Sequence, residues 1–160
     1  MNAIRLLAKF VASGQLHGIG IGSPLSEVDK KINSDFIDVT DEAGLSLRRD
    51  YGFVEFYFNP DTEWVVTGGA VELHKLAGNS SLADRWKKNM HIEFPQYVTW
   101  HQLKSELMEI INVSSLIETD QAGFIEYRMP MTRVSVLVSD DHEERDEWVG
   151  HGDVWSVSLG

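Results

Sequence analysis

The sequence predicts an α+β fold of two tandem repeats, each a helix-loop-helix followed by an antiparallel sheet of about four strands. Three observations predict it. Helical and strand patterns occur in the same order in both halves, "TDEAG" recurs as "TDQAG" at the same distance behind a predicted helix, and apolar residues make up 42% of 160 residues. A chain of this size and composition can bury a substantial core.

The first half begins with two predicted helices. "MNAIRLLAKFVASG" predicts an amphipathic helix, because Lys9 interrupts the apolar run that an export signal needs. In residues 17–32, "HGIGIGSPLSEVDKKI", the spacing G-x-G-x-G is not that of a dinucleotide fingerprint, and no P-loop Lys-Ser/Thr pair follows. Ser23 is a suitable N-cap and Pro24 suits the first helical position. The glycines therefore predict a tight link between two helices and no nucleotide site.

Extended segments follow. Val54, Phe56 and Phe58 alternate with polar positions in "FVEFYFNP", which is typical of a half-buried strand. "DFIDVT" and "GLSLRRD" precede this strand, and "EWVVTGG" and "AVELHKL" complete the predicted meander. The pattern then starts again. "SSLADRWKKNM" predicts a short helix with a serine cap, and "TWHQLKSELMEII" a longer one in which Thr99 and Gln102 have capping-box spacing.

The restart indicates a duplication. At an offset of 79 residues, Thr40 aligns with Thr119 and Gly44 with Gly123. After a longer loop in the second half, the tripeptide Glu-Trp-Val around Trp64 matches the same tripeptide around Trp148. We expect a first repeat over residues 1–78 and a second over residues 79–160, packed as one compact unit.

This organisation resembles the β-lactamase inhibitory protein family, on the strength of the "TDEAG" and "TDQAG" turns and the two "EW" segments. In that family the sheets form a concave, aromatic-rich surface that grips an enzyme. "LRRDYGFVEFYF" is similar to strand pairs of immunity proteins from bacterial polymorphic toxin systems, which are acidic and plug a toxin's active site. Both resemblances imply a protein that binds and inhibits an enzyme.

The charge balance bears on the partner. Fourteen basic against 25 acidic residues give a net charge of −11, which disfavours nucleic acid and suits a basic protein. The same acidity is also common in bacterial proteins for solubility alone. No apolar run reaches membrane-spanning length and no cysteine is present, so we expect a cytoplasmic protein with no membrane partner and no thiolate chemistry.

The strongest local feature is "SDDHEERDEW", residues 139–148. It is either a solvated hairpin tip or an acidic finger that enters a basic cleft in imitation of phosphate. Two aromatic residues, Tyr57 and Trp155, are expected at the surface beside it, whereas Trp64 and Trp148 are expected in the core because they match between the repeats. The predicted partner-binding residues are Tyr57, Asp140, Asp141, Glu143, Glu144, Asp146, Glu147 and Trp155.

No pattern indicates catalysis. None of the six histidines pairs with another at the i, i+4 spacing of a zinc helix, and no serine lies in a G-x-S-x-G elbow. We therefore predict no catalytic, cofactor or metal site. The function predicted is a cytoplasmic immunity or inhibitor protein that occludes the active site of a cognate basic toxin enzyme, such as a nuclease. The alternatives are a small-molecule-binding or enzymatic α+β domain with a pocket between the repeats, and a structural module of a larger complex.

Overall fold

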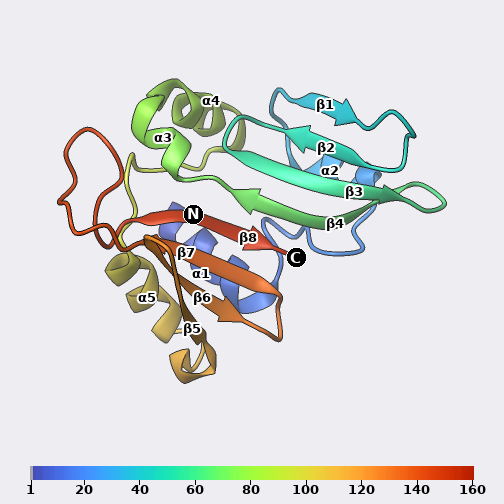
Figure 1. Cartoon of the computed structure of the whole chain (residues 1–160). Helices are drawn as coiled ribbons and strands as arrows, with labels where there is room; N and C mark the ends of the chain where they lie inside the picture. Colours follow the sequence, from blue (N-terminus) through green and yellow to red (C-terminus); the bar gives the residue numbers. More distant parts are fainter. Residues whose placement is uncertain (1) are drawn as a thin grey trace.

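A computed structural model describes residues 2–160 and confirms the α+β class. All strands of these residues join one antiparallel sheet of eight strands in the order β1-β2-β3-β4-β8-β7-β6-β5 (Figure 1). The first four strands in the chain therefore occupy one half of the sheet and the last four the other half.

Two helices and four strands make up the first part of the chain. They are α1 (Ala3–Ser13), α2 (Leu25–Lys31), β1 (Ile37–Thr40), β2 (Leu47–Asp50), β3 (Val54–Pro60) and β4 (Trp64–Val71). The second part has three α-helices, where two were expected, and a short 3-10 turn before its strands. They are α3 (His74–Gly78), α4 (Ser80–Met90), α5 (Trp100–Met108), η1 (Val113–Ser115), β5 (Ile117–Gln121), β6 (Phe124–Met129), β7 (Val134–Ser139) and β8 (Val154–Leu159).

The two halves of the sheet meet where β4 pairs with β8, with Ala70 opposite Ser158. Glycines allow β4 to approach the strands on both of its sides. A Cβ on Gly69 would lie 2.8 Å from the Glu55 carbonyl oxygen, and one on Gly68 would lie 2.8 Å from that of Leu159. These distances are too short for any side chain, so glycine is required at Gly68 where β4 approaches β8 and at Gly69 where β4 approaches β3.

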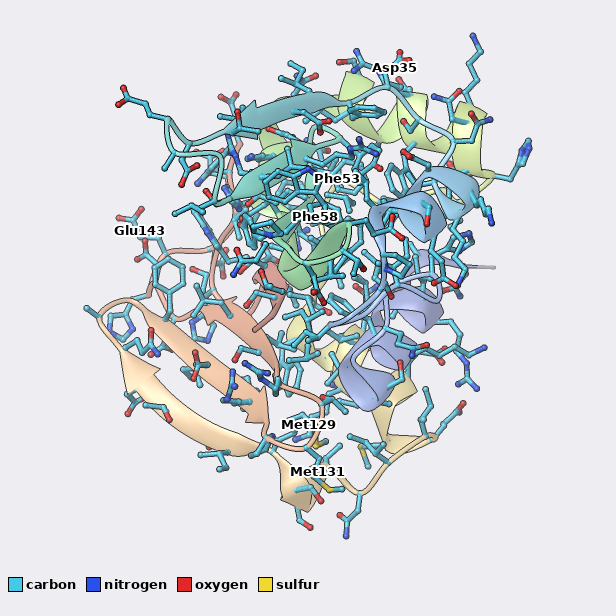
Figure 2. The ribbon with its side chains drawn as sticks, turned by 90° about the vertical axis from the view of Figure 1, so that its right-hand side faces the viewer. Asp35, Phe53, Phe58, Met129, Met131 and Glu143 are labelled. Atoms are coloured by element: carbon cyan, nitrogen blue, oxygen red, sulfur yellow. The ribbon has the colours of Figure 1, made fainter. Side chains whose placement is uncertain are left out.

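One face of the sheet forms the core. The alternation predicted for β3 is confirmed, since Val54, Phe56 and Phe58 are at most 1% exposed, and α1 and α2 lie behind the sheet in Figure 1. Phe53 and Phe58 lie in the interior of the molecule (Figure 2). The side chains that alternate with the core positions point to the opposite face, which neither α1 nor α2 covers. We call it the open face.

The glycine-rich stretch links α1 to α2, as predicted. Leu16 and Ile19 exchange backbone hydrogen bonds across a tight turn in which Gly18 has a φ of 80°. The expected Ser23 cap is wrong, because Pro24 is the N-cap residue and makes no side-chain cap. The Ser23 hydroxyl instead accepts a hydrogen bond from the Gly20 amide at 3.1 Å. The Ser23 carbonyl accepts a second one from the amide of Val66 in β4. The stretch therefore docks α2 onto the sheet.

Three expectations about the later helices can be checked. The capping box of Thr99 and Gln102 on α5 is confirmed. The serine cap of α4 is wrong, since the side chain of Asn79 caps that helix. The strand expected over "AVELHKL" is also wrong beyond Val71. Leu73, Leu76 and Ala77 are buried at the helical spacings i, i+3 and i+4, and this favours α3 over a longer strand.

Helix length and hydropathy can also be compared with what a membrane span requires. None of the helices in residues 2–160 is both long and apolar enough to cross a bilayer.

Candidate functional site

The predicted acidic segment lies in the loop that joins β7 to β8, which we call the acidic loop (residues 140–153). Asp140 is half-buried and the other five carboxylates are exposed: Asp141, Glu143, Glu144, Asp146 and Glu147. Figure 2 shows Glu143 on the side of the sheet away from α1 and α2. The loop therefore presents its negative charge beside the open face.

An internal ion pair anchors this loop. Asp153 is 2% exposed and accepts hydrogen bonds from Arg145 Nε at 2.8 Å, from Arg145 Nη2, and from the Gly150 amide at 3.0 Å. The guanidinium of Arg145 also lies over the ring of Tyr97, 4.0 Å from its centroid. The Asp153 carboxylate raises the pKa of Arg145 further. The only lysine or arginine of residues 139–148 is thus paired with Asp153, and the exposed carboxylates of this segment make no ion pair within residues 2–160.

Backbone contacts fix the loop at further points. The Asp140 amide donates to the Gly123 carbonyl at 2.9 Å, and the His151 amide donates to the Glu143 carbonyl at 3.1 Å. The His151 ring nitrogen Nδ1 lies 3.1 Å from the Asp141 carbonyl oxygen and 3.7 Å from the Asp140 carboxylate. The loop is therefore a folded structure with defined contacts at both ends.

A groove of about 550 Å³ opens beside the acidic loop. It combines aromatic rings with acidic residues from four segments of the chain. Its lining residues are Gly123, Phe124, Ser139, Asp140, Asp141, His142, Trp148, Val149 and Trp155. Three of the predicted partner-binding residues, Asp140, Asp141 and Trp155, are thus brought together.

Trp155 is the centre of the aromatic wall. Its indole stacks on the imidazole of His74 from α3, with centroids 4.2 Å apart and planes 5° apart. Trp148 and Phe124 meet Trp155 edge to face, at 6.0 Å and 5.3 Å. His74 Nδ1 also lies 3.3 Å from the Trp155 carbonyl oxygen. Elements distant in sequence therefore hold the ring in one orientation.

The expectation that Trp148 belongs to the core is wrong, because it is 46% exposed. Its proposed counterpart Trp64 begins β4 and packs partly buried against the core. The longer loop before β8 places Trp148 away from the sheet and next to the end of α3. A Cβ atom added to Gly78 of α3 would lie only 3.3 Å from the Trp148 ring. The extra loop residues explain the difference.

Tyr57 lies in a second cluster on the open face. It is 36% exposed, and its hydroxyl donates to the carboxylate of Glu55, a residue only 7% exposed. Arg48 Nη1 lies 3.4 Å from the same carboxylate. Burial and the adjacent Glu55 carboxylate raise the pKa of Tyr57 well above its ordinary value. The hydroxyl stays protonated and acts as a hydrogen-bond donor.

Glu72 adjoins this cluster. Burial raises the pKa of its carboxyl, and the neighbouring Glu55 carboxylate raises it further, while nearby His74 lowers it. The Glu72 carboxylate lies 3.4 Å from His74 Nδ1. Glu72 thus lies beside the imidazole that stacks on Trp155.

A smaller cavity, of about 270 Å³, lies between the two parts of the chain. Residues 13–15, 20 and 21 line one side, and residues 131–133 and 159 line the other. Arg133 is the one charged residue in this lining, so the cavity contains no acid and base pair. Within residues 2–160, no group of three histidine, aspartate or glutamate side chains is placed to hold a metal ion.

Sequence reasoning missed the residues that build the groove around Trp155. The sequence places His74 in a predicted strand and Arg145 in a charged stretch, and it singles out neither Phe124 nor the pairing of Arg145 with Asp153. A single arginine, Arg145, stands among the six acidic residues of this segment. Its presence there is the one local feature of the sequence that could have indicated an internal ion pair.

Comparison of the chain with protein-family models, with curated proteins and with solved structures finds no match. The function is therefore argued from the site itself.

Proposed function

We propose that this protein is a non-enzymatic inhibitor, such as an immunity protein acting in the cytoplasm, that binds a basic toxin enzyme and occludes its active site. The acidic loop and the groove beside it form the binding surface. One observation carries the proposal: Arg145 is bound to Asp153, so the loop's outward carboxylates are free to meet a partner's cations. Such a field accelerates association with a basic surface.

The aromatic wall supports the same proposal. Tryptophan supplies much contact area at small entropic cost and is enriched among residues that dominate binding energy. Trp148 is 46% exposed and Trp155 is partly exposed next to it. An exposed aromatic pair rimmed by carboxylates matches the central anchor and polar rim of a protein interface.

The test replaces Asp140, Asp141, Glu143 and Glu144 by Asn or Gln and measures binding kinetics with the purified partner, first isolated by co-purification from the native host. The on-rate should fall and depend less on salt, because rim charges act mainly on association. The matched control neutralises four exposed carboxylates that make no side-chain hydrogen bond or ion pair within residues 2–160: Asp35, Glu42, Asp61 and Asp84. Equal effects of the two variants would contradict the assignment of the binding surface.

A second candidate function, binding of a small molecule between the repeats, is favoured by the cavity that includes Arg133. A single guanidinium in a small cavity suits a monoanionic ligand. A thermal-shift screen with small carboxylates should then show stabilisation that Arg133→Gln removes. No shift with any of them would contradict this candidate.

We also infer that the chain is a tandem duplication of two α2β4 repeats, residues 1–78 and 79–160. The matched glycines support it, since Gly44 and Gly123 both have positive φ, 68° and 86°, in the turn after the first strand of each half. Gly44→Ala and Gly123→Ala should each cost about 1 kcal/mol in unfolding free energy, since a Cβ disfavours this conformation. A cost at only one turn would contradict their equivalence.

A further inference from the structure

The groove beside the acidic loop has the composition of a cation site. Trp148, Trp155, Asp140 and Asp141 are among its lining residues, and no lysine or arginine is. A cation over a tryptophan face is attracted by the ring's quadrupole, and nearby carboxylates add to the attraction. Exposed Trp148 supplies the ring surface that such a ligand would cover.

A serine side chain at the groove has no hydrogen-bond partner within residues 2–160. Ser139 is 6% exposed, lines the groove, and its side chain makes no hydrogen bond within residues 2–160. Its backbone is fully engaged, since its amide donates to the Asp153 carbonyl and its carbonyl accepts from the Gly152 amide, both at 2.9 Å. The hydroxyl oxygen is therefore available to accept a hydrogen bond from a ligand's N–H group.

The chain itself shows which ligand this chemistry holds. The guanidinium of Arg145 lies over Tyr97 and bonds Asp153. The guanidinium of Arg49 lies 3.7 Å from the Phe36 ring centroid and donates from Nε and Nη2 to Asp38, both at 2.9 Å. Both sites combine an aromatic face, a carboxylate and an arginine.

The groove contains the aromatic face and the carboxylates but no guanidinium. We propose that it binds one arginine side chain of the partner. That this arginine belongs to a basic toxin enzyme rests on the proposed function. Arginine fits better than lysine because its planar group can stack on an indole while its several N–H groups donate to acceptors of the lining, among them Asp140, Asp141 and Ser139.

The groove can be tested without the partner, by NMR titration of the full chain with Nα-acetyl-arginine amide at low salt. The indole Nε1–H signals of Trp148 and Trp155 report the groove. We expect saturable shifts with a Kd on the order of 1 mM, which is reasonable for a ligand of this size. The uncharged isostere Nα-acetyl-citrulline amide should bind at least about tenfold more weakly, since it lacks the charge.

Two variants remove separate parts of the site. Trp148→Leu should weaken binding of the arginine amide by roughly fivefold or more. The double variant Asp140→Asn, Asp141→Asn removes both charges, while each Asn keeps a side-chain oxygen that can accept the local contacts with His151 and the Glu143 amide, and it should weaken binding by about tenfold. Asp35→Asn, distant from Glu143 in Figure 2, is the matched control and should leave the Kd unchanged.

Several outcomes would overturn the inference. They are equal binding of the citrulline amide, equal binding of Nα-acetyl-lysine amide, or the absence of saturable shifts at either indole. If one of these occurs while neutralising the acidic loop still slows partner association, the arginine groove is wrong and the proposed function stands. If the arginine amide binds as expected but loop neutralisation leaves partner kinetics unchanged, the proposed function fails and the groove stands.

Discussion

Substitution of Asp153 by Asn tests whether the acidic loop is held by its buried anchor. Asn has nearly the same shape but no charge, and only one of its two terminal atoms accepts hydrogen bonds. If its oxygen replaces Oδ2, it keeps the contacts with Arg145 Nε and Gly150. Its amide group then faces Arg145 Nη2, so two donors oppose each other where Oδ1 accepted a bond.

The magnitude follows from the number and exposure of these contacts. A hydrogen bond to a charged group contributes about 1.5–3 kcal/mol, and a neutral one about half of that. One bond is lost and two are weakened, but the Arg145 side chain is 39% exposed, so solvent screens part of the gain. We expect Asp153→Asn to lower the unfolding free energy by about 2 kcal/mol, which in a chain of this length lowers Tm by roughly 4–8 °C.

Urea unfolding followed by tryptophan fluorescence measures this change. Asp146→Asn is the matched control, since Asp146 is exposed and its side chain makes no hydrogen bond or ion pair within residues 2–160; its effect should stay within about 0.5 kcal/mol. Hydrogen exchange of the Gly150 amide should accelerate in Asp153→Asn. A cost for Asp153→Asn no larger than that of the control, with Gly150 still protected, would refute the anchor.

Two further predictions concern the open face. Tyr57→Phe removes a donor from the buried Glu55 carboxylate and should lower the unfolding free energy by about 1–2 kcal/mol; urea curves that overlay those of the wild type would contradict this. Burial raises the pKa of Glu72 above its unfolded value, so its contribution to stability is present below about pH 4.5 and is lost as pH rises through the raised pKa. Glu72→Gln should therefore match the wild type near pH 4 and exceed it in stability at pH 7, by less than about 1 kcal/mol because the group is partly solvated. A variant less stable than the wild type at pH 7 would contradict the sign.

The sequence predicted the features whose causes are local. Alternation of Val54, Phe56 and Phe58 indicates a strand because successive side chains point to opposite faces. The Thr99 and Gln102 capping box predicts where α5 begins because both bonds lie within one turn. The α3 helix was missed because Leu73 continues the alternating pattern of β4, while burial of Leu76 and Ala77 depends on the tertiary fold.

The site was less predictable because strand pairing distant in sequence assembles it. Trp155 meets Phe124 because β8 pairs with β7 and β7 with β6. It meets His74 because β8 also pairs with β4, from which α3 follows. A single sequence carries no signal for either pairing. The match between Trp64 and Trp148 was a poor guide, since similarity between segments does not fix burial when one lies in a longer loop.

The distance between the predicted binding residues limits the kind of ligand that can use them all. Tyr57 lies opposite Gly68 of β4, and Gly69 lies opposite Leu159 of β8, so Tyr57 is level with the end of β8. Trp155 lies near the other end of that strand. Tyr57 and Trp155 are two strand spacings of about 4.8 Å apart across the sheet and some five residues of about 3.3 Å each apart along the strands. The two displacements are perpendicular, so the residues lie about 20 Å apart. A small-molecule site of ordinary size spans about half of this, whereas a standard protein interface of about 800 Å² per partner easily covers it. Tyr57 and Trp155 can therefore contact the same ligand only if that ligand is a macromolecule, and a ligand confined to the groove leaves Tyr57 untouched.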